Sequence, residues 1–214
     1  MTVITAYLKS ASTIRSFLAT SDVAKYWDYP SALDEWTVAG LAGHLARPVL
    51  NLAGVLAEPV PEHADLHSAV DYYAMMPAAD ADLESPAARA IRERGVESAG
   101  RDIADLLARY DRALEASAAL LPSLPANHEI GTPAQGGGVR MLLAEYLKTR
   151  MVEMLVHADD LAVSVGVRYP EFPPEATDEV LATLARISAR RNKPTDLLRA
   201  LTRVERPIER ITIF

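Results

Sequence analysis

The 214-residue chain contains no cysteine. Disulfide bonds and zinc sites with thiolate ligands are therefore excluded. Any catalytic nucleophile must be a hydroxyl, a carboxylate, an imidazole, a metal-activated water or a separate small molecule. If the protein carries out thiol chemistry, the thiol comes from outside the chain.

Phenylalanine is scarce, with three residues, and acidic residues outnumber basic ones to give a net charge of −7. This charge disfavours non-specific binding of nucleic acid, and we expect no nucleic-acid partner. No run of about 18 apolar residues is present to span a bilayer. The N-terminal segment lacks the charged region, apolar stretch and cleavage site of a secretory signal. We therefore expect no membrane partner and a cytoplasmic location.

Alanine and leucine are abundant, which favours helix over sheet. Apolar residues recur at helical spacing in four long segments. Thr37 is a plausible N-cap for the second segment, and Pro48 predicts a kink within it. Gly95 and Gly100 are weak points of the third segment, and Gly166 is a stop signal for the fourth. The predicted long helices are residues 2–19, 38–57, 86–121 and 141–166.

The remaining segments predict shorter elements. A short helix is predicted over residues 68–76, an amphipathic helix over 173–191, and another short helix over 197–201. The tail, residues 206–214, alternates apolar and polar residues and is compatible with a strand or with packed coil. The predicted fold class is mainly α: a four-helix bundle of residues 1–166, with residues 167–214 as a helical extension packed on it.

The sequence places a carboxylate and an imidazole on one face of the fourth helix. Glu153 and His157 are four residues apart, so both could bind one metal ion. His44, in the second helix, is the candidate third ligand, since three protein ligands and an open position are usual for catalytic zinc. The alternatives are ordinary ones: a half-buried His44, a simple Glu153–His157 hydrogen bond, or a Glu153–Arg150 pair on a polar stripe.

Asp160 follows His157 by three residues and lies on the same side of the helix. Metal-bound histidines usually donate their other ring N–H to a carboxylate or carbonyl, which Asp160 or Asp159 could supply. The alternative is a solvated acid near the end of the helix, where the helix dipole disfavours it. A second pair, His63 and His67, could also bind metal, but its loop-like segment favours adventitious surface histidines.

Two separated motifs resemble one known family. WTVAGLAGHLARP and YLKTRMVEMLVHADDLAVSVG are similar to the opening motif and the Arg-x-x-Glu-x-x-x-His-x-x-Asp-Leu helix of the mycothiol-dependent maleylpyruvate isomerase N-terminal family. This family is a branch of the DinB-like superfamily. The resemblance covers residues 1–166, with both motifs in the expected order. It places His44, Glu153 and His157 at the metal ligands, and Arg150 and Asp160 at two other recurrent positions.

The resemblance implies a DinB-like four-helix bundle with a divalent metal ion, usually zinc, near one end. It also implies activation of a low-molecular-weight thiol for isomerisation or S-transfer. The isomerase that the chain resembles carries a further small α/β domain. Here only residues 167–214 follow the bundle, so this domain is reduced or absent.

We therefore expect a divalent-metal-dependent S-transferase or isomerase that uses a mycothiol-like thiol and a small-molecule substrate. A homodimer is compatible with the sequence. The alternatives are a metal-dependent hydrolase that uses metal-bound water, and a non-catalytic metal-binding bundle. An open coordination position would favour an enzyme, whereas a closed ligand shell would favour binding alone.

Overall fold

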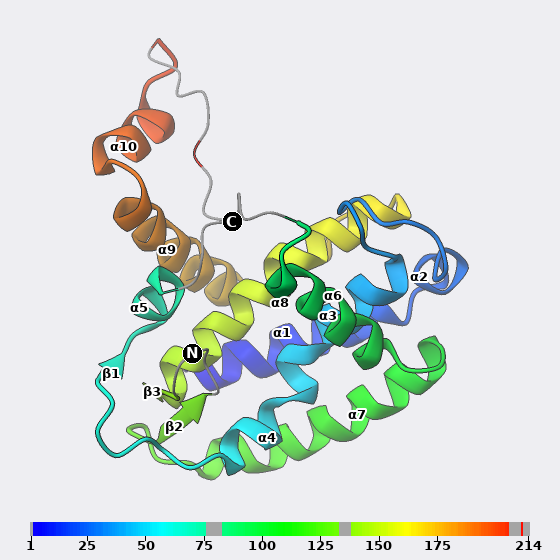
Figure 1. Ribbon diagram of the computed structural model, residues 1–214, viewed down its shortest axis with the longest axis horizontal. Coiled ribbons are helices and arrows are strands. Elements are labelled where there is room, and N and C mark those ends of the chain that lie inside the picture. Colours follow the sequence, from blue (N-terminus) through cyan, green and yellow to red (C-terminus); the bar gives the residue numbers. More distant parts are fainter. Residues whose placement is uncertain (1, 76–82, 133–137, 206–210, 212–214) are drawn as a thin grey trace.

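The computed structural model describes residues 2–75, 83–132, 138–205 and 211. These residues form a mainly helical structure with a small sheet near the ends of several helices (Figure 1). The predicted fold class is confirmed. Within these residues, no helix is both long and apolar enough to cross a membrane.

Four helices form the bundle: α1 (Val3–Leu18), α3 (Val38–Leu50), α7 (Ile103–Leu120) and α8 (Leu143–Val165). α3 and α1 each pack against both α7 and α8, so the four helices close around one core. Burial of each large apolar side chain in this core contributes about 1.5–3 kcal/mol. Fully buried core residues include Tyr7, Ile14, Leu41, Leu45, Leu106, Tyr110, Leu147 and Met151.

Shorter helices surround the bundle. α6 (Pro86–Ala99) lies across α3, and α9 (Pro174–Arg191) packs on α8 and on α5 (Ala69–Ala74). α10 (Pro194–Thr202) contacts α9 and projects from the molecule (Figure 1). The remaining helical elements are α2 (Ser21–Lys25), α4 (Leu52–Ala57) and the 3₁₀ turn Leu121–Ser123.

The sheet has the strand order β1-β3-β2. β2 (Glu129–Thr132) and β3 (Val139–Leu142) are antiparallel, with Ile130 opposite Met141. β1 (Leu66–His67) runs parallel to β3. Met141 and Leu142 were predicted to begin the fourth helix. They belong instead to β3, and α8 starts at Leu143.

Two of the predicted long helices are divided. The predicted helix 38–57 is two helices that meet at Asn51, and Pro48 lies inside the first of them. The predicted helix 86–121 ends at Ala99 and restarts at Ile103. Gly100 has a φ of 73°, which side-chain-bearing residues rarely adopt, and Asp102 caps the next helix through a hydrogen bond from the Asp105 amide.

The C-terminal predictions have mixed outcomes. The helix predicted over 173–191 is α9, and the one predicted over 197–201 is the longer α10. Gly166 ends α8 in the left-handed conformation, as predicted from the sequence. The tail predicted as strand or coil lies outside the described residues except for residue 211. The division into domains 1–166 and 167–214 stays a prediction.

Candidate metal centre

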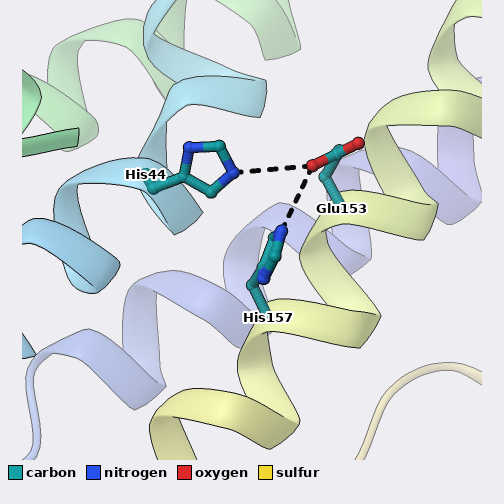
Figure 2. A group of neighbouring side chains, drawn as sticks. All are labelled: His44, Glu153 and His157. Carbon is teal, nitrogen blue, oxygen red and sulfur yellow. Dashed lines mark ion pairs between the residues drawn. The ribbon is translucent and has the colours of Figure 1, made fainter. Parts of the chain in front are cut away.

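Figure 2 shows His44 of α3 facing Glu153 and His157 of α8. Glu153 Oε2 lies 3.6 Å from His44 Nε2 and 3.4 Å from His157 Nε2. One ligand atom from each residue lies within 4.8 Å of the other two. The structure thus brings together the three residues that the sequence singled out as candidate ligands.

Local structure explains how each side chain reaches the centre. Thr37 Oγ1 accepts a hydrogen bond from the Gly40 amide at 3.0 Å, which fixes the start of α3 two turns before His44. α8 is unbroken from Leu143 to Val165, so Glu153 and His157 project from the same face. Because α3 and α8 are neighbours in the bundle, the two faces meet.

Two of the three separations between the donor atoms, those that involve Glu153 Oε2, fit a shared ion. Two ligand atoms about 2.1 Å from a tetrahedral zinc ion are separated by about 3.4 Å. The observed separations of 3.4 and 3.6 Å match this value. Direct hydrogen bonds between a charged nitrogen and a carboxylate are shorter, about 2.7–2.9 Å. The Glu153–His157 separation of 3.4 Å is longer than this.

Asp160 occupies the position expected for a partner of His157. Its Oδ2 lies 2.9 Å from His157 Nδ1. When Nδ1 donates to this carboxylate, Nε2 faces Glu153. His44 has no such partner, since its buried Nδ1 makes no hydrogen bond within the described part of the chain.

Arg150 lies one turn before Glu153 on α8. Its guanidinium packs on the Tyr146 ring, 5.0 Å from the ring centroid, and Nε donates to Thr149 Oγ1 at 3.0 Å. The Glu153 carboxylate pairs with the two histidines rather than with Arg150. The alternative of a Glu153–Arg150 pair on a polar stripe is therefore not what the structure contains.

The three side chains have different pKa directions. Burial would raise the pKa of Glu153, but His157, His44 and the Arg150 charge outweigh it and hold the pKa well below its usual range. Burial would lower the pKa of His157, but hydrogen bonds to Asp160 and Glu153 prevail and raise it to about 9. Burial also lowers the pKa of His44, and there it prevails. At neutral pH the metal-free centre thus holds a carboxylate, an imidazolium and a neutral imidazole.

The metal-free protein should lose stability as the pH rises from about 6.5 to about 9. The pKa of His157 is about 9 in the folded chain and about 6.5 in an unfolded one, so the folded chain binds this proton more tightly. The stabilisation is complete below pH 6.5 and is lost as the pH passes 9. At about 1.4 kcal/mol per pKa unit, the loss is roughly 3 kcal/mol.

Urea denaturation of metal-free protein across this pH range measures the effect. A His157→Gln variant should lack the slope, because the amide does not titrate. A wild-type free energy of unfolding that stays constant or increases across the range would contradict the assignment.

The centre lies largely within the bundle. The side chains of His44, Glu153 and His157 are 16%, 22% and 21% exposed. All three side chains are therefore mostly buried, with a minor part of each at the surface.

The other histidine pair does not build a comparable cluster. Across the described residues, only His44, Glu153 and His157 form a group of three that could hold a metal ion. Asp71, close to His67 in the sequence, instead accepts hydrogen bonds from Ser68 and pairs with Arg190. His63 is exposed, whereas His67 is partly buried in β1 rather than in a loop.

Sequence reasoning missed the contact of Tyr73 with the centre. The hydroxyl of Tyr73, on α5, donates to Glu153 Oε1 at 2.9 Å. Nothing in the sequence near Tyr73 points to this contact, because its partner lies 80 residues further along the chain.

Comparison with known proteins agrees with this geometry. The profile of the family described as "Mycothiol maleylpyruvate isomerase N-terminal domain" matches residues 8–162. No curated protein sequence gives a significant match. Among solved structures, the crystal structure of the mycothiol-dependent maleylpyruvate isomerase is similar, with a TM-score of 0.53 and 21% identity. A histidine-to-alanine mutant of the isomerase gives a TM-score of 0.52 and 19% identity.

Both similarities cover 86% of this chain and 66% of the isomerase chain. The present chain therefore spans just under two thirds of the length of those relatives. At these identities the structural likeness shows the shared fold. The profile match extends over well more than half of the chain, and the chain belongs to the mycothiol maleylpyruvate isomerase N-terminal domain family.

Proposed function

We propose that this protein is a divalent-metal-dependent enzyme that uses a low-molecular-weight thiol, as an S-transferase or an isomerase. The observation that carries the proposal is the convergence of two imidazoles and one carboxylate, with Glu153 Oε2 at 3.6 and 3.4 Å from the two Nε2 atoms. Membership of a family named for a mycothiol-dependent isomerase supports the thiol.

His44, Glu153 and His157 would hold the ion, and zinc suits their nitrogen and oxygen donors. When bound, a divalent ion here would supply the charge that deprotonates a thiol and holds it as the thiolate. Two neutral imidazoles and one carboxylate offset only one of the two positive charges, so the centre favours an anionic ligand. No cysteine of the chain competes for it.

The neighbouring residues prepare the ligands. Asp160 accepts a hydrogen bond from the Nδ1–H of His157, so that Nε2 is directed to the centre. Burial keeps His44 neutral, which leaves its Nε2 lone pair available. Arg150 keeps a positive charge near Glu153 and helps to hold this carboxyl ionised.

The proposal extends to the reaction class and not to a named substrate. Maleylpyruvate is the substrate named for the similar isomerase, of which this chain covers 66%. A thiol nucleophile and a small electrophile are common to isomerisation and S-transfer. The cytoplasmic location and the homodimer stay predictions.

Binding of a thiol to the metal-loaded protein should release about one proton, because a free thiol with a pKa near 8.5 is mostly protonated at pH 7. Calorimetry in buffers of different ionisation enthalpy measures this release on mixing with mycothiol, bacillithiol or glutathione. Turnover should require both the ion and the thiol. Glu153→Ala, which removes the carboxylate ligand, should release no proton under the same conditions.

Two other outcomes would replace the proposal. Loaded protein that binds none of these thiols but hydrolyses an ester or amide is a metal-dependent hydrolase. Loaded protein that does neither is a metal-binding bundle without turnover.

A further inference from the structure

Tyr73 is a buried residue of α5, with 1% of its surface exposed. Its hydroxyl lies 2.9 Å from Glu153 Oε1 and 3.1 Å from the Thr149 carbonyl oxygen, and it donates towards both. The other carboxylate oxygen, Oε2, faces His44 and His157. The two oxygens of Glu153 therefore have separate partners: one faces the tyrosine and the other faces the candidate metal position.

α5 is held in this place by contacts from α8 and α9. Arg190 Nη1 of α9 lies 2.5 Å from Asp71 Oδ1, and Arg191 of α9 donates to the Tyr73 carbonyl oxygen. From α8, Glu145 Oε2 accepts a hydrogen bond from the Ala69 amide at 2.9 Å. α5 has only six residues, too few for a stable helix by itself, so these contacts are needed to position it.

We propose that Tyr73 is a positioning residue for the metal centre, and that the C-terminal helix α9 keeps it in position through α5. The inference rests on the proposed metal-dependent function. The family match ends at residue 162. The proposal therefore assigns a role at the metal centre to residues that lie outside this match.

The physical reason lies in the rotation of the carboxylate. The terminal torsion of a glutamate side chain is broad and roughly two-fold, so an unrestrained carboxylate samples many orientations. A hydrogen bond to Oε1 restricts this rotation and leaves Oε2 directed at the two imidazoles. Partners of this kind typically contribute 10–100-fold to metal affinity.

Tyr73→Phe, which removes only the hydroxyl, tests the proposal. Tyr110→Phe is the matched control, since Tyr110 is 0% exposed and its hydroxyl donates to the Ala11 carbonyl oxygen at 2.9 Å, within the bundle. The measurements are Zn²⁺ affinity by competition with a chromophoric chelator and the visible absorption of the Co²⁺-loaded protein. Tyr73→Phe should weaken Zn²⁺ binding by about 10–100-fold and change the Co²⁺ spectrum. Tyr110→Phe should leave both unchanged.

Arg190→Met tests the part played by α9. It removes the ion pair with Asp71 and should weaken Zn²⁺ binding, though less than Tyr73→Phe does. Arg199→Met is its control, because it removes an ion pair with Asp196 within α10. That variant should bind Zn²⁺ like the wild type.

The outcomes separate this inference from the proposed function. A wild-type protein that takes up neither Zn²⁺ nor Co²⁺ overturns both. A wild type that binds Zn²⁺, together with equal affinities for Tyr73→Phe and Tyr110→Phe, overturns the positioning role alone. A loss in Tyr73→Phe without any loss in Arg190→Met overturns the part assigned to α9.

Discussion

Replacing His157 by alanine should abolish stoichiometric binding of a divalent ion. The change removes one of three protein donors, and the remaining His44 and Glu153 offer only two. Loss of a direct ligand should exceed the 10–100-fold cost typical of a residue that only supports one, so we expect a loss of more than about 100-fold. Elemental analysis and chelator competition measure it, against an expected one ion per chain in the wild type.

The matched control is His63→Ala, which removes an exposed imidazole outside the centre. Circular dichroism should show the same helical content for both variants and the wild type. Metal content that is unchanged in His157→Ala would remove this residue from the site.

Gly43→Ala should destabilise the fold and also disturb the centre. A Cβ at Gly43 would lie 2.1 Å from the Gly95 carbonyl oxygen and 2.4 Å from the Ala99 amide nitrogen. Both are backbone atoms of α6, so no side chain can rotate to make room and α3 and α6 must separate. We expect a loss of about 3 kcal/mol in the free energy of unfolding, at the upper end of typical overpacking costs. His44 follows directly in the chain, so Zn²⁺ affinity should fall as well.

Gly54→Ala is the control for this change. No atom lies within 4 Å of a Cβ built at Gly54, which is also helical. Alanine is favoured over glycine in a helix by up to about 1 kcal/mol, so this variant should be as stable as the wild type or more stable. The free energy of unfolding of the two metal-free variants, measured by denaturant titration, tests this prediction. If Gly43→Ala proved as stable as Gly54→Ala, the close approach of α3 and α6 would be wrong.

The sequence predicted where helices occur better than where they break. The periodicity of apolar residues identified all four bundle helices, because the residues that face the core recur every three or four positions along a helix. The break at Gly100 was among the predicted weak points, whereas the one at Asn51 was not. Pro48, which was expected to kink its helix, lies inside α3 shortly before the break at Asn51. The positions of such helix breaks depend on tertiary packing, which the local sequence pattern does not determine.

The sequence likewise predicted part of the candidate metal centre and not the rest. The helical spacing of Glu153 and His157 and the resemblance of two motifs to one family were sufficient to name the candidate ligands. Asp160 was also accessible to this reasoning, since it lies three residues from His157 on the same helix. Residues within one helix have nearly fixed separations, so sequence spacing translates into distance.

The sequence by itself therefore determined a mainly α chain, the absence of protein thiols and three candidate ligands. Only the tertiary structure decided that α3 lies beside α8, which brings His44 to within 3.6 Å of Glu153. It also decided that the Tyr73 hydroxyl donates to that carboxylate and that Arg191 of α9 donates to the Tyr73 carbonyl oxygen. The physical reason is that distances between separate helices are set by how their side chains pack, and this packing depends on the whole core rather than on any one segment.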